Sequence, residues 1–327
     1  MRNYLSRWKK IMPERKVSHP EVGTQEYKQH IEEEIEHFSR LYSDAEAQQT
    51  LFYAVPGSWI EVERRTLELV RRLTGNDEIG HVVRRLNERA DVKMLSLGSG
   101  ACGVEIDVAR KARSSSIHCI DINGELLDLG RSHALNEGLN ITTEVVDLNT
   151  VDLPAEAFDY VFCHAGLHHL IELEHIARQI SRTLRPGGEF IVVDIITRSG
   201  YLMWPETREV VRAVWKTLPI KYRLNHTAYS KPQIDNEIWE ADTSQYGMEC
   251  ARSEDIVRIL GKELVPRQFV PLQSISRRFF DTMYGPNYDL SIPLDLAVFN
   301  WIWELDSHYL SNSTLKPETF FGIYAKE

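Results

Sequence analysis

From residue 92 onward, short runs of β-forming residues alternate with runs of helical periodicity. The β-rich runs cover residues 93–97, 117–121, 142–146, 160–163 and 189–194. Between the last two, apolar residues recur at helical spacing up to Leu184, and the Arg-Pro-Gly-Gly run at 185–188 is expected to close that helix. Strands that alternate with helices form parallel sheets covered on both faces. The alternation therefore predicts an α/β fold with a doubly wound sheet.

The segments around this core are mainly helical. Residues 1–90 are expected to form an N-terminal helical extension, in which Ser58 and Glu61 have the spacing of a capping box for a helix that ends before Gly75. The core follows at 91–197. An aromatic-rich helical insert is expected at 198–250, and the remaining core strands, near 268–272 and at 319–325, lie in 251–327 with a second helical insert.

Composition excludes several classes of protein. The chain has 327 residues with a net charge of −10, which disfavours a surface that follows nucleic acid phosphates. No apolar run is long enough to span a bilayer, and the N-terminus lacks the apolar stretch of a signal peptide. The four cysteines include no Cys-x-x-Cys pair. We therefore expect a cytoplasmic protein that binds neither nucleic acid nor membrane, and a homodimer is one possible state.

A glycine-rich turn follows the first predicted strand and indicates a nucleotide-like ligand. Gly98, Gly100 and Gly103 have the spacing G-x-G-x-x-G, which suits a tight turn that a ligand approaches closely. Asp121 stands 18 residues after Gly103, at the end of the second strand, where a carboxylate can accept two hydrogen bonds from a ribose diol. The ligand is expected to contain adenosine, as a dinucleotide or as S-adenosyl-L-methionine (SAM).

Three later features favour SAM. Val-Val-Asp-Leu at 145–148 places a carboxylate after the third strand, Phe-Asp-Tyr-Val at 158–161 opens the fourth, and Leu-Arg-Pro-Gly-Gly at 184–188 precedes the fifth. In this order the motifs resemble those of the small-molecule type of class I SAM-dependent methyltransferases. The resemblance is close over about residues 90–197 and resumes at 252–272 and 315–326. It implies a Rossmann-like seven-stranded sheet with an antiparallel last strand, and SAM as the cofactor.

The resemblance also implies a set of cofactor-binding residues. Gly98, Ser99 and Gly100 would wrap the amino acid part of SAM, with Gly103 closing the turn, and Asp121 with Ile122 would hold the ribose. Asp147 and Leu148 would contact the adenine, and the backbone at Cys163 and His164 would contact the amino group. One departure concerns Ser96, because many relatives carry an acidic residue two positions before the first glycine. Ser96 is expected to accept one hydrogen bond or hold a water, and to change the affinity for SAM.

Histidines after the fourth strand are the candidate catalytic bases. Methyl transfer to a hydroxyl requires alignment of the nucleophile and removal of its proton, and an imidazole of ordinary pKa can accept that proton at neutral pH. We name His168 and His169 as candidates, with His226 and Tyr229 of the insert as second choices; the Leu-His-His-Leu run could instead only shape the SAM pocket. His164, His168 and Glu172 have a spacing seen in metal sites, but the position of His164 on a strand end disfavours a shared face, and no metal is expected.

These observations predict an enzyme that methylates a small molecule, at a hydroxyl of a natural-product or sugar-like acceptor, with the aromatic insert as a cover over the substrate. Two alternatives stay open. A methyltransferase fold that binds SAM or its product without catalysis would serve as a regulator or scaffold, and Ser96 supports this interpretation. An NAD-dependent oxidoreductase fits the glycine turn and Asp121, but the sequence lacks a Tyr-x-x-x-Lys pair on a helix.

Overall fold

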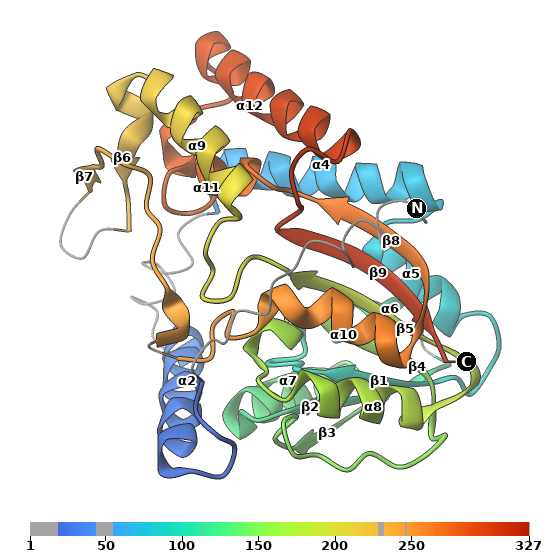
Figure 1. Ribbon diagram of the computed structural model, residues 1–327. Coiled ribbons are helices and arrows are strands. Elements are labelled where there is room, and N and C mark those ends of the chain that lie inside the picture. The colour runs from blue at the N-terminus through green and yellow to red at the C-terminus, as the bar shows by residue number, and fades with distance from the viewer. Residues whose placement is uncertain (1–18, 44–54, 113, 228–231, 246, 327) are drawn as a thin grey trace.

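The computed structural model describes residues 19–43, 55–112, 114–227, 232–245 and 247–326. Its centre is one seven-stranded sheet of order β3-β2-β1-β4-β5-β9-β8 (Figure 1). The strands are β1 (Lys93–Leu97), β2 (Ser116–Asp121), β3 (Ile141–Val145), β4 (Phe158–His164), β5 (Leu184–Ile195), β8 (Val265–Leu272) and β9 (Thr319–Ala325). Strands β1 to β5 pair in parallel, and β9 is antiparallel to both of its neighbours. The predicted Rossmann-like fold class is confirmed.

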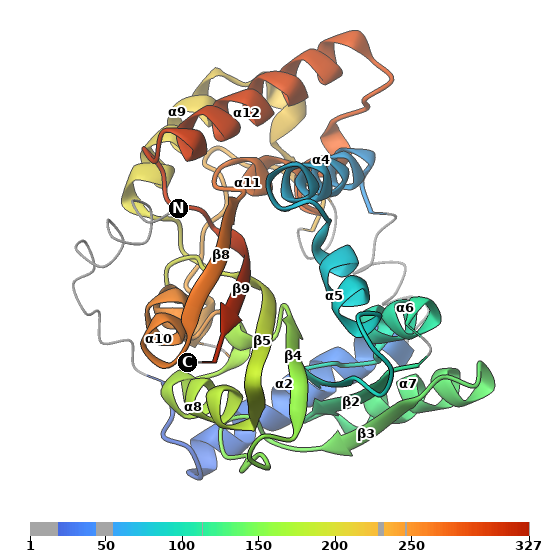
Figure 2. The ribbon, with the colours of Figure 1, turned by 90° about the vertical axis from the view of Figure 1, so that its right-hand side faces the viewer.

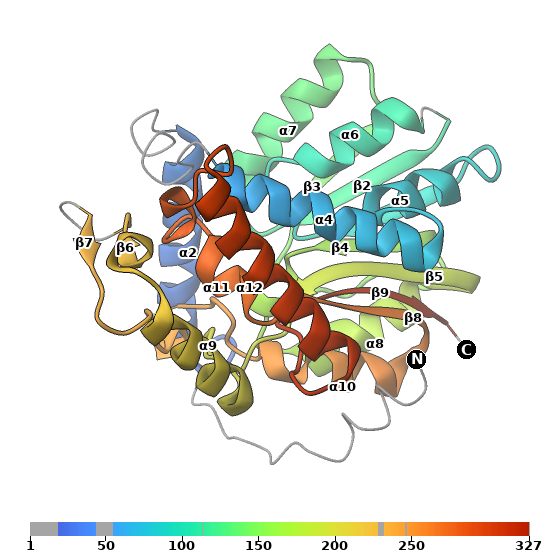
Figure 3. The same ribbon diagram turned by 90° about the horizontal axis from the view of Figure 1, so that it is seen from above.

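Helices cover both faces of the sheet, as Figure 3 shows from above. One face packs on α5 (Glu78–Leu86), α6 (Gly103–Lys111) and α7 (Gly124–Asn136), and the other on α8 (Leu173–Thr183) and α10 (Ile256–Glu263). Successive strand residues point to opposite faces. Met94 therefore joins the apolar cluster with α5, α6 and α7, and Leu95 joins the cluster with α8 and α10. Burial on both sides explains why these strands are apolar throughout.

A helical subdomain stands above the sheet in Figure 2. It contains α4 (Gly57–Thr74), α9 (Pro205–Thr217), α11 (Ser276–Phe280) and α12 (Pro293–Ser311) around one apolar cluster. Trp215 of α9 and Phe299 of α12 are fully buried there. Parts of three predicted segments, 1–90, 198–250 and 251–327, therefore share one core. The short strands β6 (Leu224–Asn225) and β7 (Gln233–Ile234) form a separate hairpin.

Helix α2 (Gln25–Ser43) lies across the end of the sheet at which the parallel strands finish, which we call the carboxyl edge (Figure 1). Its Tyr27 hydroxyl donates to Asp147 Oδ2 at 2.7 Å, just after β3. The side-chain amide of Asn123 donates to the Ile35 carbonyl at 3.2 Å. These contacts fix the helix against loops that follow β2 and β3. None of the helices in the described ranges is long and apolar enough to cross a membrane.

The predicted capping box at Ser58 is wrong. The Ser58 side chain is fully buried against the segment after α11, and its hydroxyl donates to the Gly285 carbonyl at 2.9 Å. Glu61 forms ion pairs with Arg64 and Arg65. A tertiary contact thus uses the hydroxyl that the local pattern assigned to the helix end. The predicted end of the helix is correct, since Gly75 follows α4 with a φ of 90° and its N–H donates to the Arg71 carbonyl.

The Arg-Pro-Gly-Gly run also differs from its prediction. Helix α8 ends at Thr183, and Leu184 already pairs with Phe158 of β4. The next regular pair joins Glu189 to Tyr160, so residues 185–188 bulge out of β5. Pro186 cannot donate to a strand neighbour, and Gly187 has a φ of 77°, which together favour a bulge. The run interrupts a strand and does not simply close a helix.

Gly130 of α7 lets the helix approach the glycine-rich turn. A Cβ at this position would lie 2.7 Å from the Ala101 carbonyl oxygen and 2.8 Å from Cys102 Sγ. We expect Gly130→Ala to lower the free energy of unfolding by about 1–3 kcal/mol, measured by urea unfolding, because the methyl group collides with backbone. Gly261→Ala in α10 is the control, since its Cβ meets open space and should raise stability by up to about 1 kcal/mol. Equal effects of the two substitutions would contradict this packing argument.

Candidate functional site

A cavity of about 310 Å³ lies between the carboxyl edge of the sheet and α2. Predicted site residues that line it are Gly98, Ser99, Gly100, Gly103, Asp121, Ile122, Asp147, Leu148, His164 and His169. Ser96, Cys163, His168 and His226 are not among the lining residues. From α2 the cavity receives Ile31, Glu34, Ile35, Phe38 and Tyr42. Residues distant in the sequence thus form one site at the place where open α/β sheets bind ligands.

Asp121 organises the glycine-rich turn. Its Oδ2 accepts the Gly100 N–H at 2.8 Å and its Oδ1 accepts the Asn123 N–H at 2.8 Å. Gly98 and Gly100 have φ values of 64° and 48°, a region that favours glycine. Burial raises the pKa of the Asp121 carboxyl, and the two backbone donors lower it. The carboxylate therefore fixes the turn while its remaining lone pairs face the cavity.

The buried carboxylate near the glycine-rich turn comes from α6 and not from position 96 of β1. Ser96 is fully buried and its hydroxyl donates to Glu105 Oε1 at 2.6 Å. Glu105 lies in the first turn of α6, is 3% exposed and lines the cavity. Burial raises the pKa of its carboxyl, and the bond from Ser96 lowers it. Serine on β1 thus supports a carboxylate that reaches the cavity from the helix, and the sequence analysis missed Glu105.

Asp147 lines the cavity and at the same time holds α2. Besides the Tyr27 hydroxyl, it accepts the Asn149 N–H at 2.8 Å. The Asn149 side chain donates to the Tyr27 oxygen at 2.9 Å and accepts the N–H groups of Ile171 and Glu172. This network connects the loop after β3, helix α2 and the start of α8.

His168 is oriented by a buried carboxylate that the sequence analysis did not identify. Its Nδ1 lies 2.6 Å from Asp194 Oδ1, and Asp194 Oδ2 accepts the Leu167 N–H at 2.8 Å. An ionised carboxylate only accepts, so Nδ1 carries the proton and Nε2 is directed toward Glu249, 3.7 Å away. Asp194 stands near the end of β5, and an acidic residue there among apolar ones was the available signal.

His169 is a cation in this arrangement. Its Nδ1 lies 3.2 Å from Glu34 Oε1 of α2, and its Nε2 lies 3.6 Å from Glu249 Oε2. Burial alone would lower the pKa of His169, but Glu34 and Glu249 raise it to about 9. The expectation that an unperturbed imidazole accepts a proton at neutral pH therefore does not hold for His169. Its charge instead links α2 to the loop after β4.

The other predicted residues lie elsewhere. The backbone N–H of His226 donates to the Met283 carbonyl, and its ring Nε2 lies 2.9 Å from Asn287 Oδ1. These contacts hold His226 in the helical subdomain and not at His168. Cys163 is fully buried within β4. Tyr229 lies outside the described residues. Within 200–247 no described residue lines the cavity, which α2 covers instead.

One group of side chains has the composition of a metal site. His168, Glu249 and Cys250 each offer a ligand atom, and these atoms lie within 4.8 Å of one another. The Cys250 thiol is buried and donates to Glu249 Oε1 at 3.2 Å, and burial with Glu249 raises its pKa well above the usual value. This group is different from the His164, His168 and Glu172 set considered from spacing.

The charge of His169 generates a prediction about pH. Because its folded pKa is about 9 and its ordinary value 6.5, the stabilisation is complete below pH 6.5 and is lost as the pH rises through 9. Glu34→Gln should lower the pKa of His169 by about one unit or more, followed by NMR titration of the imidazole, and should flatten the loss of stability above pH 6.5. Glu36→Gln is the control, because Glu36 is exposed on a different face of α2. It should leave the pKa of His169 and the pH dependence of stability unchanged. An unaltered His169 pKa in the Glu34 variant would refute the pairing.

Comparisons with known proteins find methyltransferases that match the part of the chain containing β1 to β5. A methyltransferase domain model matches residues 94–188. A sterol 4-C-methyltransferase of Caenorhabditis elegans is 27% identical over 123 residues, 37% of this chain and 36% of that protein. The ubiquinone/menaquinone biosynthesis C-methyltransferase UbiE of Bordetella parapertussis is 28% identical over 107 residues, 32% of this chain and 42% of that protein. The chain thus matches less than half of the length of these relatives.

A solved structure shares the fold over almost the whole chain. Geranyl diphosphate C-methyltransferase from Streptomyces coelicolor A3(2), solved with Mg²⁺, geranyl diphosphate and S-adenosyl-L-homocysteine, has a TM-score of 0.50 at 13% identity. The likeness covers 94% of this chain and 100% of that one. It supports the sheet order and the flanking helices described above.

The cavity suits SAM chemically. Buried Glu105 and partly buried Asp121 offer carboxylates to an ammonium group and to ribose hydroxyls, and Leu126, Leu148 and Leu170 offer apolar walls to a ring. The glycine turn brings backbone to the cavity surface. The domain match extends from β1 to β5 on a sheet of this order, which supports a class I SAM-dependent methyltransferase domain at residues 94–188, with SAM as its cofactor.

Proposed function

We propose that the protein transfers a methyl group from SAM to a small-molecule acceptor, and that the acceptor atom is a hydroxyl oxygen. When bound, SAM supplies an electrophilic methyl group on a sulfonium centre. The observation that carries the proposal is the Asp194–His168 pair beside a cavity that fits this cofactor. A buried carboxylate that binds Nδ1 fixes the ring so that Nε2 is the atom that would take the proton, as in other carboxylate–imidazole pairs.

His168 is the proton acceptor in this proposal. Its Nε2 points toward Glu249. Because His168 is only 3% exposed, bulk water competes little for this nitrogen. His169, whose ring centroid lies 4.1 Å from that of His168, carries a positive charge near neutral pH and is not the base. It would keep α2 closed over the cofactor and exclude water from the reaction.

Glu105 is the proposed partner of the ammonium group of SAM. It is the buried acidic side chain that replaces the carboxylate missing at position 96, and Ser96 fixes one of its oxygens. Asp121 would bind the ribose, and Asp147 with Leu148 would face the adenine. With a carboxylate present, Ser96 no longer favours a protein that merely binds SAM without using it.

Methylation at carbon is the second candidate. The relatives from Caenorhabditis elegans and Bordetella parapertussis are named as C-methyltransferases, and their matched parts coincide with the cofactor-binding core. A carbon acceptor that must lose a proton would use the same base. Reaction with SAM labelled with ¹³C in the methyl group, followed by NMR of the product, distinguishes a methyl on oxygen from one on carbon. Absence of any methylated product from an acceptor panel, despite tight SAM binding, would favour the non-catalytic alternative.

Glu105→Gln should weaken the binding of SAM at least tenfold, because the neutral amide loses its charge-assisted bond to the ammonium group. The binding of 5′-methylthioadenosine, which lacks the amino acid part, should stay the same. Calorimetric titration measures both ligands. Glu125→Gln, an exposed residue at the start of α7, is the control. Equal weakening of both ligands by Glu105→Gln would show that Glu105 acts on the fold of the cavity and not on the ammonium group.

His168→Gln should slow turnover about a hundredfold or more while SAM affinity stays within a factor of about three, because general-base catalysis typically contributes that much. Asp194→Asn should have a similar effect, since it no longer fixes the tautomer. The rate of S-adenosyl-L-homocysteine formation with a productive acceptor is the measurement. His133→Gln on the exposed face of α7 is the control. Normal turnover of the His168 variant would exclude it as the base.

A further inference from the structure

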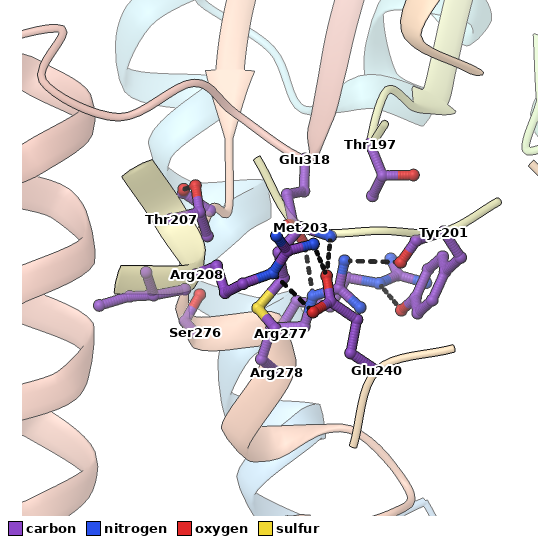
Figure 4. A network of polar contacts seen from close by, with 12 residues as sticks. Thr197, Tyr201, Met203, Thr207, Arg208, Glu240, Ser276, Arg277, Arg278 and Glu318 are labelled. Atoms are coloured by element: carbon purple, nitrogen blue, oxygen red, sulfur yellow. Dashed lines mark hydrogen bonds and ion pairs between the residues drawn. The ribbon is translucent and has the colours of Figure 1, made fainter. Parts of the chain in front are cut away.

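Three guanidinium groups gather where the helical subdomain meets the sheet (Figure 4), and two of them form ion pairs with carboxylates among the described residues. Arg208 forms two hydrogen bonds to Glu240, of 2.7 and 2.8 Å. Arg278 donates to Glu318 at 2.8 Å, with both side chains buried. The third, Arg277, does not form an ion pair with any carboxylate in the described part of the chain. Arg277 is therefore the one of these three arginines without a direct ion pair among the described residues.

Arg277 is held in place by aromatic neighbours. Its Nε donates to the Tyr201 hydroxyl at 2.7 Å, and its guanidinium carbon lies 5.5 Å from the Tyr201 ring centre and 5.7 Å from that of Trp59. Asp281 acts on its charge, but that carboxylate accepts the N–H groups of Met283 and Tyr284 and makes no ion pair with Arg277. A guanidinium has five N–H donors in a planar fork, and the described protein contacts use one of them.

Arg277 lies on the same side of the molecule as the proposed base. Tyr201 follows Gly200, whose N–H donates to the Cys250 carbonyl at 2.8 Å. Glu249 precedes Cys250 and contacts both His168 and His169, and His169 lines the cofactor cavity. The charges of Arg277 and Glu249 also act on each other. A short series of contacts thus leads from Arg277 to the place where the methyl group would be transferred.

We propose that Arg277 and Tyr201 form the subsite for an anionic group, a carboxylate or a phosphate, on the acceptor molecule. This inference rests on the proposed methyltransferase function and specifies its substrate class. Arg277 is half-buried and forms no direct ion pair among the described residues, and the planar fork of arginine matches the two oxygens of a carboxylate or phosphate. Trp59 and Tyr201 keep the fork in one orientation, and the Tyr201 hydroxyl adds a polar contact. An acidic acceptor would form the direct ion pair that Arg277 lacks among the described residues.

The test titrates the full-length protein, saturated with S-adenosyl-L-homocysteine, with two anions and a neutral control. Inorganic pyrophosphate represents phosphates, benzoate represents carboxylates, and benzamide has the shape of benzoate without its charge. We expect one of the anions to bind and benzamide not to bind, and Arg277→Gln to weaken that anion at least tenfold. The anion that binds identifies the class. Failure of both anions to bind, or equal binding by the variant, overturns the proposal.

Control variants separate this role from a structural one. Arg212→Gln removes a half-exposed positive charge from α9 and should leave anion binding unchanged. Arg277→Lys keeps the charge but lacks the fork, and Tyr201→Phe keeps the ring but lacks the hydroxyl; each should weaken anion binding about threefold to tenfold. If Arg277→Gln does not fold, Arg277→Lys and Tyr201→Phe test the anion subsite in its place. Unchanged anion affinity in both would contradict the subsite.

The affinity for SAM, measured on the same preparations, separates the two proposals. Normal SAM binding with no anion binding removes the subsite and leaves the methyltransferase function intact. Anion binding that depends on Arg277 in a protein that does not bind SAM would support the subsite as a binding site and overturn the methyltransferase function on which its role as an acceptor site rests.

Discussion

Buried carboxylates at the carboxyl edge of the sheet are the constraint on which the rest of the site depends. Removing a carboxylate from water is costly unless donors replace the lost hydration. Asp121 and Asp194 receive backbone N–H groups from the loops after β1, β2 and β4, and Glu105 receives the Ser96 hydroxyl. The same bonds that make burial tolerable also fix the loops. The carboxylates and the loops around the cavity are therefore held by the same hydrogen bonds.

The matched domain and the helical subdomain carry the two proposed sites separately. The matched methyltransferase domain ends at residue 188, whereas the helical subdomain is assembled from α4, α9, α11 and α12, most of which lie outside that match. The cofactor site uses the sheet edge and α2. The network around Arg277 lies where the subdomain meets the sheet. The proposed acceptor subsite and the proposed cofactor site thus lie on different parts of the fold.

Local patterns predicted the strands well because each strand of this sheet is apolar and bounded by turn residues. They also indicated Asp121 and the glycine turn, which a hydrogen bond joins over 21 positions. They missed Glu105, because a glutamate in the first turn of a helix is ordinary there, and they missed Asp194 within an apolar strand. Glu34 and Glu249 meet at His169 from opposite ends of the chain, and no local signal indicates such a meeting. Ser58 fits a capping pattern but bonds to Gly285, 227 positions away.

The position of α2 was equally inaccessible to periodicity. An amphipathic pattern predicts that a helix packs one face, but not against which partner, and the contact of Tyr27 with Asp147 joins residues 120 positions apart. The aromatic insert was the more conspicuous candidate for a cover, yet much of it packs within the helical subdomain. The central claim is therefore that α2 covers the bound cofactor.

Hydrogen–deuterium exchange with and without SAM tests that claim most directly. We predict that SAM slows exchange in residues 25–43 and in the glycine turn at 98–105, whereas α9 and α12 stay unchanged and NAD has no effect. A SAM-bound protein in which residues 25–43 exchange as fast as in the free protein would contradict the assignment of α2 as the cover of the cofactor site. Equal protection by NAD would contradict the assignment of the cofactor itself.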